Sequence, residues 1–256
     1  MATTSRDALE MVKTAEKHDQ KLMVGYMKRY DSGVLKAKEA FHSFAENDEI
    51  AYARSHLFGG DWICGPTAEE RIETDEPYPR IQVKFPEFLP KAYENLMNNL
   101  LEQIHDVNLP RFFLGDPSEV TFSRVWPRGF ISALSYSEYP LILEMGSISA
   151  DFWDERLVIY FKNGWIDLRP PPPLLRNVPA KVHVYRAGKT QRDEFPHGSW
   201  TWSFERQAQH FVECIIEDKE PLSNGLDSYK DIVIVEDILK AMLNGKPEKI
   251  DFTRSS

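Results

Sequence analysis

From residue 50 onward, the sequence is dominated by short β-rich runs that follow one another closely. The runs cover residues 50–58, 119–126, 130–137, 141–149, 157–161, 165–168 and 181–185. Several of them are closed by turn residues, such as Lys162-Asn163-Gly164, which favour tight hairpins. Consecutive strands joined by tight turns predict an antiparallel sheet, and this pattern constrains the fold more than any other feature.

The first 48 residues predict a helix, a strand and a second helix. A capping pattern at Thr4 and Asp7 begins a helix that extends to about residue 18. The apolar run at residues 21–26 predicts a short buried strand, and Ser32 is placed to cap a helix that ends at residues 47–48. This order of elements is typical of a parallel α/β unit whose first strand is missing.

Two late helices complete the expected elements. They cover residues 204–217 and 227–243, and the second ends before Gly245 and Pro247. Each has an apolar face, which is expected to pack on one face of the sheet. The sequence therefore predicts an α+β fold, in which a large, mostly antiparallel open sheet carries helices on one face.

Charge and hydropathy limit the classes of partner that this protein is expected to bind. The chain has 256 residues, a net charge of −9 and 40 acidic against 31 basic residues, which disfavours nucleic acid and anionic membranes as partners. No stretch reaches the roughly 20 apolar residues of a membrane span. Asp7, Glu10 and Glu16 stand where a signal peptide would be apolar. We therefore expect a cytoplasmic protein with a small-molecule or protein partner.

The two cysteines indicate neither a metal site nor a disulfide framework. Cys64 and Cys214 are 150 positions apart, which matches no metal-ligand spacing. Apolar neighbours such as Phe211 and Ile215 predict that Cys214 is a small core residue on a helix. No metal is expected.

Three stretches, in order along the chain, carry a family resemblance. Residues 21–33 read Lys-Leu-Met-Val-Gly-Tyr-Met-Lys-Arg-Tyr-Asp-Ser-Gly, and residues 105–117 read His-Asp-Val-Asn-Leu-Pro-Arg-Phe-Phe-Leu-Gly-Asp-Pro. The third stretch begins with Ser-Trp-Thr-Trp-Ser-Phe at residues 199–204 and continues to residue 227. The ordered set covers nearly the whole chain. It resembles the C-terminal part of the glucose-fructose oxidoreductase / inositol dehydrogenase / MocA (Gfo/Idh/MocA) family.

The resemblance implies a division into two parts. Family members have an N-terminal Rossmann domain with a G-x-G-x-x-G turn and a catalytic Glu-Lys-Pro motif, followed by an α+β domain with an open sheet for oligomerisation. In relatives, the lysine motif comes immediately before a segment that resembles residues 1–7. Residues 1–31 are thus expected to be a remnant of the Rossmann-like, dinucleotide-binding domain, and residues 32–256 the substrate-binding and oligomerisation domain. The missing half is expected in a longer reading frame or a separate subunit.

The family's cofactor is NAD(P), but we expect this chain alone to bind none. A dinucleotide pyrophosphate needs a glycine turn that leads into a helix start. The glycine pair Gly59-Gly60 is instead followed by Asp61-Trp62. We expect the chain to bind a sugar or polyol and to form a homo-oligomer through the open sheet.

His105 corresponds to the family's acid/base histidine, which comes from an Asp-x-x-x-His motif. Four residues before it stands Leu101 instead of aspartate, and the nearest carboxylate is Glu102. On a helix, Glu102, His105 and Asn108 would share one face and line a polar pocket. Because of Pro110, a helix in this region is expected either to begin anew or to kink. The alternative is a buried histidine bonded to backbone.

Three further residues are candidates for substrate binding. Arg29 and Tyr30 match the family segment whose side chains face the substrate cleft. Arg29 can hold a substrate carboxylate or phosphate, or form a surface ion pair. Trp126, near a strand end, can stack on a sugar ring or pack in the core.

Three functions remain open at the level of sequence. The first is the substrate-binding and oligomerisation portion of an NAD(P)-dependent oxidoreductase acting on a sugar, cyclitol or related polyol. The second is a descendant with non-redox acid/base activity, an isomerase or lyase that uses His105 and Glu102. The third is a non-catalytic binding or assembly protein.

Overall fold

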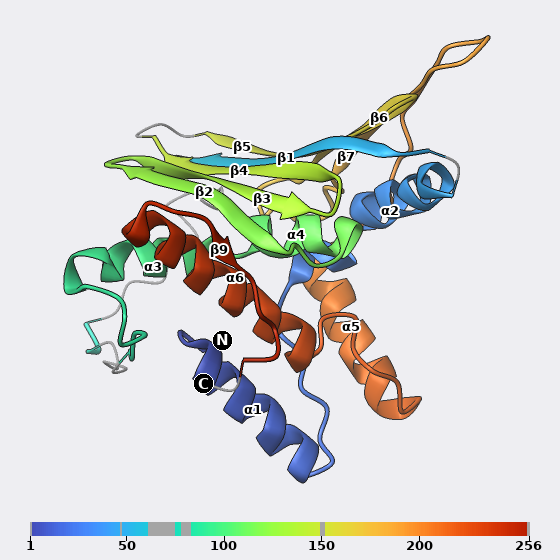
Figure 1. Ribbon diagram of the computed structural model, residues 1–256. Helices are drawn as coiled ribbons and strands as arrows, with labels where there is room; N and C mark the ends of the chain where they lie inside the picture. Colours follow the sequence, from blue (N-terminus) through green and yellow to red (C-terminus); the bar gives the residue numbers. More distant parts are fainter. Residues whose placement is uncertain (1, 47, 61–74, 78–82, 149–151, 255–256) are drawn as a thin grey trace.

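The computed structural model describes residues 2–46, 48–60, 75–77, 83–148 and 152–254, which form one open β-sheet with helices beneath it (Figure 1). The strands are β1 (Ile50–Gly59), β2 (Glu119–Trp126), β3 (Gly129–Tyr136), β4 (Tyr139–Ser147), β5 (Trp153–Phe161), β6 (Gly164–Arg169), β7 (Lys181–Arg186), β8 (Arg192–Glu194) and β9 (Glu248–Lys249). The helices are α1 (Ser5–Lys17), α2 (Ser32–Ala45), α3 (Glu94–Glu102), α4 (His105–Leu114), α5 (Ser203–Ile216) and α6 (Gly225–Asn244). The described part of the chain also contains the short 3-10 helices η1 (Met27–Tyr30) and η3 (Lys91–Tyr93).

The sheet is mostly antiparallel, as the hairpin pattern predicts. In the described part of the chain its strand order is β8-β7-β6-β5-β1-β4-β3-β2-β9. β1 lies near the middle, parallel to β4 and antiparallel to β5. Every other neighbouring pair is antiparallel. β8 and β9, of three and two residues, are too short for the sequence pattern to show.

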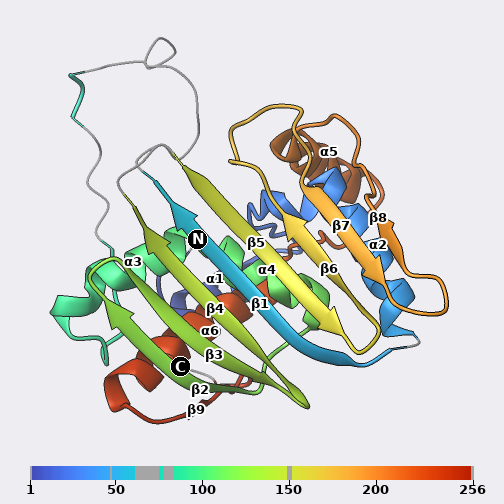
Figure 2. The ribbon, with the colours of Figure 1, turned by 90° about the horizontal axis from the view of Figure 1, so that it is seen from above.

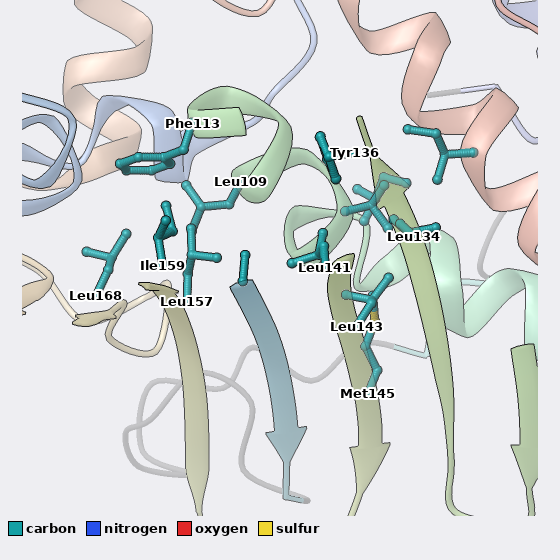
Figure 3. Close-up of a cluster of buried hydrophobic side chains, with 14 of the residues drawn as sticks. Leu109, Phe113, Leu134, Tyr136, Leu141, Leu143, Met145, Leu157, Ile159 and Leu168 are labelled. Carbon is teal, nitrogen blue, oxygen red and sulfur yellow. The ribbon is translucent and has the colours of Figure 1, made fainter. Parts of the chain in front are cut away.

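Helices cover one face of the sheet, and Figure 2 shows the other face with no described helix over it. α6 lies between β2 and α1, which explains why most of its residues are buried. In Figure 3, Leu141, Leu157 and Ile159 of the central strands face Leu109 and Phe113 of α4. All five side chains are buried, so the core lies between the sheet and the helices.

Two expectations for the first 48 residues are wrong. Residues 21–26 form no strand, because their neighbour is the segment before α6 and not a sheet. Met23 makes an isolated bridge to Asn224, and Val24 N–H donates to Ser223 O at 2.9 Å. The cap of α2 is Asp31, not Ser32: its carboxylate accepts from two backbone amides at the helix start.

The prediction that α5 packs on the sheet is also wrong. α5 lies against η1, away from the strands (Figure 1), because α2, α4 and α6 already cover the sheet. Cys214 is buried, as predicted, whereas Cys64 lies outside the described residues. Val212, Ile215 and Ile216 remain 54%, 57% and 75% exposed. We call these three side chains the apolar face of α5.

Two helices that the sequence pattern did not reveal, α3 and α4, position the region around His105. The helical conformation is interrupted between α3 and α4, so that His105 is the first residue of α4. Pro110 stands inside α4 and cannot donate to the carbonyl of Asp106. Ser55 Oγ donates to that carbonyl instead, at 3.4 Å. No described helix is long and apolar enough to cross a membrane.

A buried ion-pair network joins η1, α4 and α6. Asp231 of α6 is fully buried; its carboxylate accepts from Arg111 at 2.6 Å and from Asn108 at 2.7 Å. Arg29 donates to Asn108 Oδ1 at 2.7 Å and pairs with Asp227 at 2.7 Å. Each member compensates another, which allows these charges to be buried.

We predict that Asp231→Asn lowers the free energy of unfolding by about 3 kcal/mol, because it leaves buried guanidinium charge without its main anion. Urea unfolding measures the change. Asp218→Asn is the matched control, since Asp218 is almost fully exposed in its pair with Lys21, and it should leave the transition unchanged. Equal effects of the two substitutions would show that the network does not stabilise the fold.

Candidate functional site

A cavity of about 990 Å³ lies beside the helix break. Residues of η1, η3, α3, the first turn of α4 and the β2–β3 hairpin line it, together with the ends of β1, β4 and β5. Its size is at the upper end of the range for small-molecule sites, which reaches about 1,000 Å³. The fold therefore places a large concave site where α4 begins.

One wall of the cavity carries amide side chains. Asn95, Asn99 and Gln103 are four residues apart, which places them on one face of α3 and its C-terminal end. Both asparagines are exposed. We call these three residues the amide stripe. Amides both donate and accept hydrogen bonds, which suits a ligand with many hydroxyl groups.

Aromatic side chains line other parts of the cavity. Trp126 comes from the end of β2, Trp153 from the start of β5, Tyr93 from η3 and Phe204 from α5. An indole or phenyl ring provides a flat apolar surface with a polar edge nearby. The cavity thus combines hydrogen-bonding amides with flat apolar surfaces.

His105 lines this cavity and is partly buried. Burial lowers the pKa of its imidazole well below the ordinary value, and the positive charge of Lys28 lowers it further. Its Nδ1 is buried and has no hydrogen-bond partner among the described residues. The ring contacts Tyr26 edge-on, with centroids 5.9 Å apart. His105 is therefore held neutral at pH 7 beside a space that a ligand can enter.

Lys28 also lines the cavity, and two buried carboxyl groups lie with it. Lys28 Nζ pairs with Glu155 Oε1 at 2.5 Å. Burial and the charge of Glu155 raise the pKa of Asp106 to about 8, whereas Lys28 opposes this shift. At neutral pH Asp106 is thus predominantly a neutral carboxylic acid.

The structure brings together only part of the residues predicted from sequence. His105, Glu102 and Trp126 all line the cavity, with Glu102 exposed at the end of α3. Arg29, Tyr30 and Asn108 are buried and are not among the cavity's lining residues.

The contacts of these three residues explain their position. The guanidinium of Arg29 bonds Asn108, Asp227 and the carbonyl of Leu222. The Tyr30 hydroxyl bonds Ser223 Oγ at 2.8 Å. Their polar atoms therefore hold protein groups, so they support the site from behind and do not face a ligand.

Lys28, Asp106 and Glu155 were not selected from the sequence. Glu155 did carry a signal, because it shares the alternation of β5 with the buried Leu157 and Ile159. A carboxylate in phase with core residues is rarely buried without a partner. The amide stripe also had a signal in its four-residue spacing.

The glycine pair Gly59-Gly60 stands at the end of a described segment. Gly60 N–H donates to Phe152 O at 2.8 Å, and Gly59 O accepts from Ile148 N at 3.0 Å, so both glycines belong to strand pairing. Neither begins a described helix. The described part of the chain also contains no group of three or more potential metal-binding side chains.

No protein-family profile matches the sequence, and a search of curated proteins finds no match. Solved structures do match. The aldose-aldose oxidoreductase from Caulobacter crescentus, complexed with glycerol, has a TM-score of 0.72 at 19% identity, over 97% of this chain and 70% of that chain. Levoglucosan dehydrogenase with NADH and levoglucosan has a TM-score of 0.71 at 14% identity, over 97% of this chain and 71% of that chain.

A putative NADPH-dependent oxidoreductase from Desulfitobacterium hafniense has a TM-score of 0.75 at 12% identity, over 97% of this chain and 70% of that chain. At these identities the likeness concerns the fold. The chain shares its fold with about 70% of the length of each of these oxidoreductases, as the resemblance seen in the sequence implies for the fold.

We predict that His105 titrates in the folded protein well below its unfolded pKa of about 6.5, because burial and the charge of Lys28 both disfavour the imidazolium. Proton NMR of the imidazole, assigned with His105→Gln, measures this. Lys28→Met should raise the pKa by removing a positive charge, while burial still keeps it depressed. Because the unfolded chain binds the proton more tightly, this residue's contribution to stability falls as pH drops below about 6.5. A midpoint at or above 6.5 would contradict the account.

Proposed function

We propose that the chain is the substrate-binding and oligomerisation portion of an NAD(P)-dependent oxidoreductase that acts on an uncharged sugar, cyclitol or related polyol. The observation that carries this proposal is the cavity, in which the amide stripe and aromatic rings surround the neutral His105. Similar folds occur in a levoglucosan dehydrogenase with NADH bound and an aldose-aldose oxidoreductase.

The charged side chains around the cavity favour an uncharged ligand because they offset one another: Glu102 and Arg128, which both line it, carry opposite charges. Lys28 is paired with Glu155, and Asp106 is predominantly protonated at neutral pH. Arg29 supplies no charge to the cavity, because it is paired with Asp227. Hydroxyl groups can instead bond the amide stripe, and the apolar side of a sugar ring can rest on Trp126.

In this proposal the dinucleotide is bound outside the described residues. The matched structures extend well beyond this chain, which covers 70% of the aldose-aldose oxidoreductase. Residues 1–31 are proposed to belong with the nucleotide-binding domain, and residues 32–256 to the substrate-binding domain. The apolar face of α5 is a suitable surface for that domain, whether in the same polypeptide or in a separate subunit.

The uncovered face of the sheet is proposed to form a homo-oligomer. Tyr160 lies on this face, since Leu157, Ile159 and Phe161 alternate with it toward the core. Phe122 of β2 lies on the same face. It pairs with Ala133, which lies between two buried positions of β3 and therefore faces away from the core. Exposed aromatic residues on a broad sheet favour contact with a second copy.

The alternative function is acid/base catalysis without redox chemistry, as in an isomerase or lyase. The observation that favours it is the coexistence of a neutral imidazole at His105 and a protonated carboxyl at Asp106, which are opposite partners for proton transfer. In the third alternative, a binding or assembly protein, the cavity binds no polyol.

We predict that D-glucose, myo-inositol or glycerol binds the cavity and that Asn99→Ala weakens the binding about tenfold, through the loss of a hydrogen bond. Isothermal titration calorimetry measures the affinity. Asn98→Ala is the matched control, because Asn98 is on the same helix but does not line the cavity. Parallel titrations with NADH and NADPH should show no binding to this chain alone.

Polyol binding that is equal in the two variants would place the ligand elsewhere. Failure of all three polyols to bind would favour the assembly protein. Tight NADH binding by the chain would contradict our account of the dinucleotide.

We predict a dimer or larger assembly at micromolar concentration, and a shift toward monomer in Tyr160→Glu, because a charge would be buried against the second copy. Light scattering coupled to size exclusion measures the mass. Val212→Glu, on α5, is the control and should leave the mass unchanged. A monomeric parent protein would contradict assembly through the sheet.

A further inference from the structure

Three ionisable side chains gather at one end of the cavity, and the proposed function leaves two of them without a role. Lys28 comes from η1, Asp106 from α4 and Glu155 from β5. Their exposed fractions are only 6%, 1% and 3%. The fold thus brings together three buried charge-bearing groups from distant parts of the sequence. We call them the lysine–carboxyl cluster.

Hydrogen bonds distinguish the two carboxyl groups of this cluster. Glu155 uses both oxygens: Oε1 pairs with Lys28 Nζ at 2.5 Å, and Oε2 accepts from Trp153 Nε1 at 3.2 Å. Asp106 Oδ2 is buried and has no hydrogen-bond partner among the described residues. Glu155 is therefore suited to carry the negative charge, whereas Asp106 is suited to carry a proton.

A charge count supports the same assignment. Two carboxylates and one ammonium would leave a net negative charge in a buried site, which is costly. Asp31 at the start of α2 adds negative potential at Glu155, and His105, on which the charge of Lys28 acts, is neutral. One shared proton makes the cluster neutral.

We propose that Lys28 binds a substrate oxygen through its ammonium hydrogens, and that Asp106 and Glu155 are positioning residues that share one proton and exchange it beside that oxygen. The ligand class rests on the proposed function, whereas the shared proton does not. Lys28 lines the cavity, and the two carboxyl groups contact it or act on it electrostatically.

The proton transfer balances without a further reactant. Above about pH 8, where the carboxyl pair is predominantly ionised, Lys28 passes one proton to it and takes the proton of a bound hydroxyl in exchange. The O–H bond of the substrate breaks, a carboxyl O–H bond forms, and the substrate oxygen keeps the electron pair as an alkoxide next to the ammonium. In reverse, the protonated pair returns the proton to the oxygen.

Trp153 gives a direct readout of the cluster. Its indole donates to Glu155, and Lys28 Nζ lies 5.6 Å from its ring centroid. We predict a change in Trp153 fluorescence with a midpoint near pH 8, identified by its loss in Trp153→Phe. Asp106→Asn should abolish the change. Asp154→Asn, which alters the half-exposed neighbour of Glu155, should retain it.

Infrared spectroscopy supplies a second measurement that needs no ligand. The parent protein should show a protonated carboxyl band below pH 8 that disappears above it, and Asp106→Asn should lack that band. Loss of the fluorescence change together with retention of native circular dichroism would exclude misfolding as the cause. A fluorescence change that persists in Asp106→Asn, or a parent protein without the band, would overturn the shared proton.

Calorimetry with myo-inositol tests the binding part of the proposal. Lys28→Met should weaken binding about tenfold, and repeating the titration near pH 8 in buffers of different ionisation enthalpy should reveal proton exchange that is absent in Asp106→Asn. Unchanged affinity in Lys28→Met would overturn its role as a ligand. If the spectroscopic signals are present but no polyol binds, the proposed function fails while the proton-sharing pair stands.

Discussion

The buried carboxylate of Asp231 is the interaction on which the geometry of the site depends. Arg111 and Asn108, one turn apart on α4, both bind it, so α4 has a fixed rotation against α6. With that rotation set, the first turn of α4 presents His105 to the cavity. Arg29 extends the network to η1, whose Lys28 enters the same cavity. Residues that never contact a ligand thus determine where the chemistry can occur.

Much of the fold could be predicted from sequence, because strands and hairpins are encoded locally. β2 is rich in β-branched and aromatic residues and ends at turn residues, so its bounds agree with those expected, although a bulge between Val120 and Phe122 interrupts its alternation. The segment at residues 21–26 shows the limit: its composition suits a strand, but pairing depends on a neighbour that arrives 200 residues later in the chain. The apolar face of α5 shows a second limit, because periodicity reveals that a helix has an apolar face but not which part of the protein covers it.

The candidate site, too, could be predicted from the sequence only in part. Family resemblance selected His105, and a position near a strand end selected Trp126; both residues line the cavity. It also selected Arg29, a residue type suited to substrate or to internal support; only its tertiary contacts place it in the network. Lys28 and Glu155 are 127 positions apart, so no local pattern could have paired them. A buried charge in the apolar phase of a strand is the signal to look for in such sequences.

The position of β1 has a consequence for how the chain folds. β2, β3 and β4 join through successive hairpins, as do β5, β6 and β7, whereas β1 precedes both groups in sequence and lies between them in space. Its parallel pairing joins Ala53 to Leu141, a closure of 88 residues. Such long-range contacts slow folding, because the loop entropy is lost before the contacts form. We therefore expect insertion of β1 to be a late step of folding, one that joins two locally assembled half-sheets and completes the cavity, which the end of β1 lines.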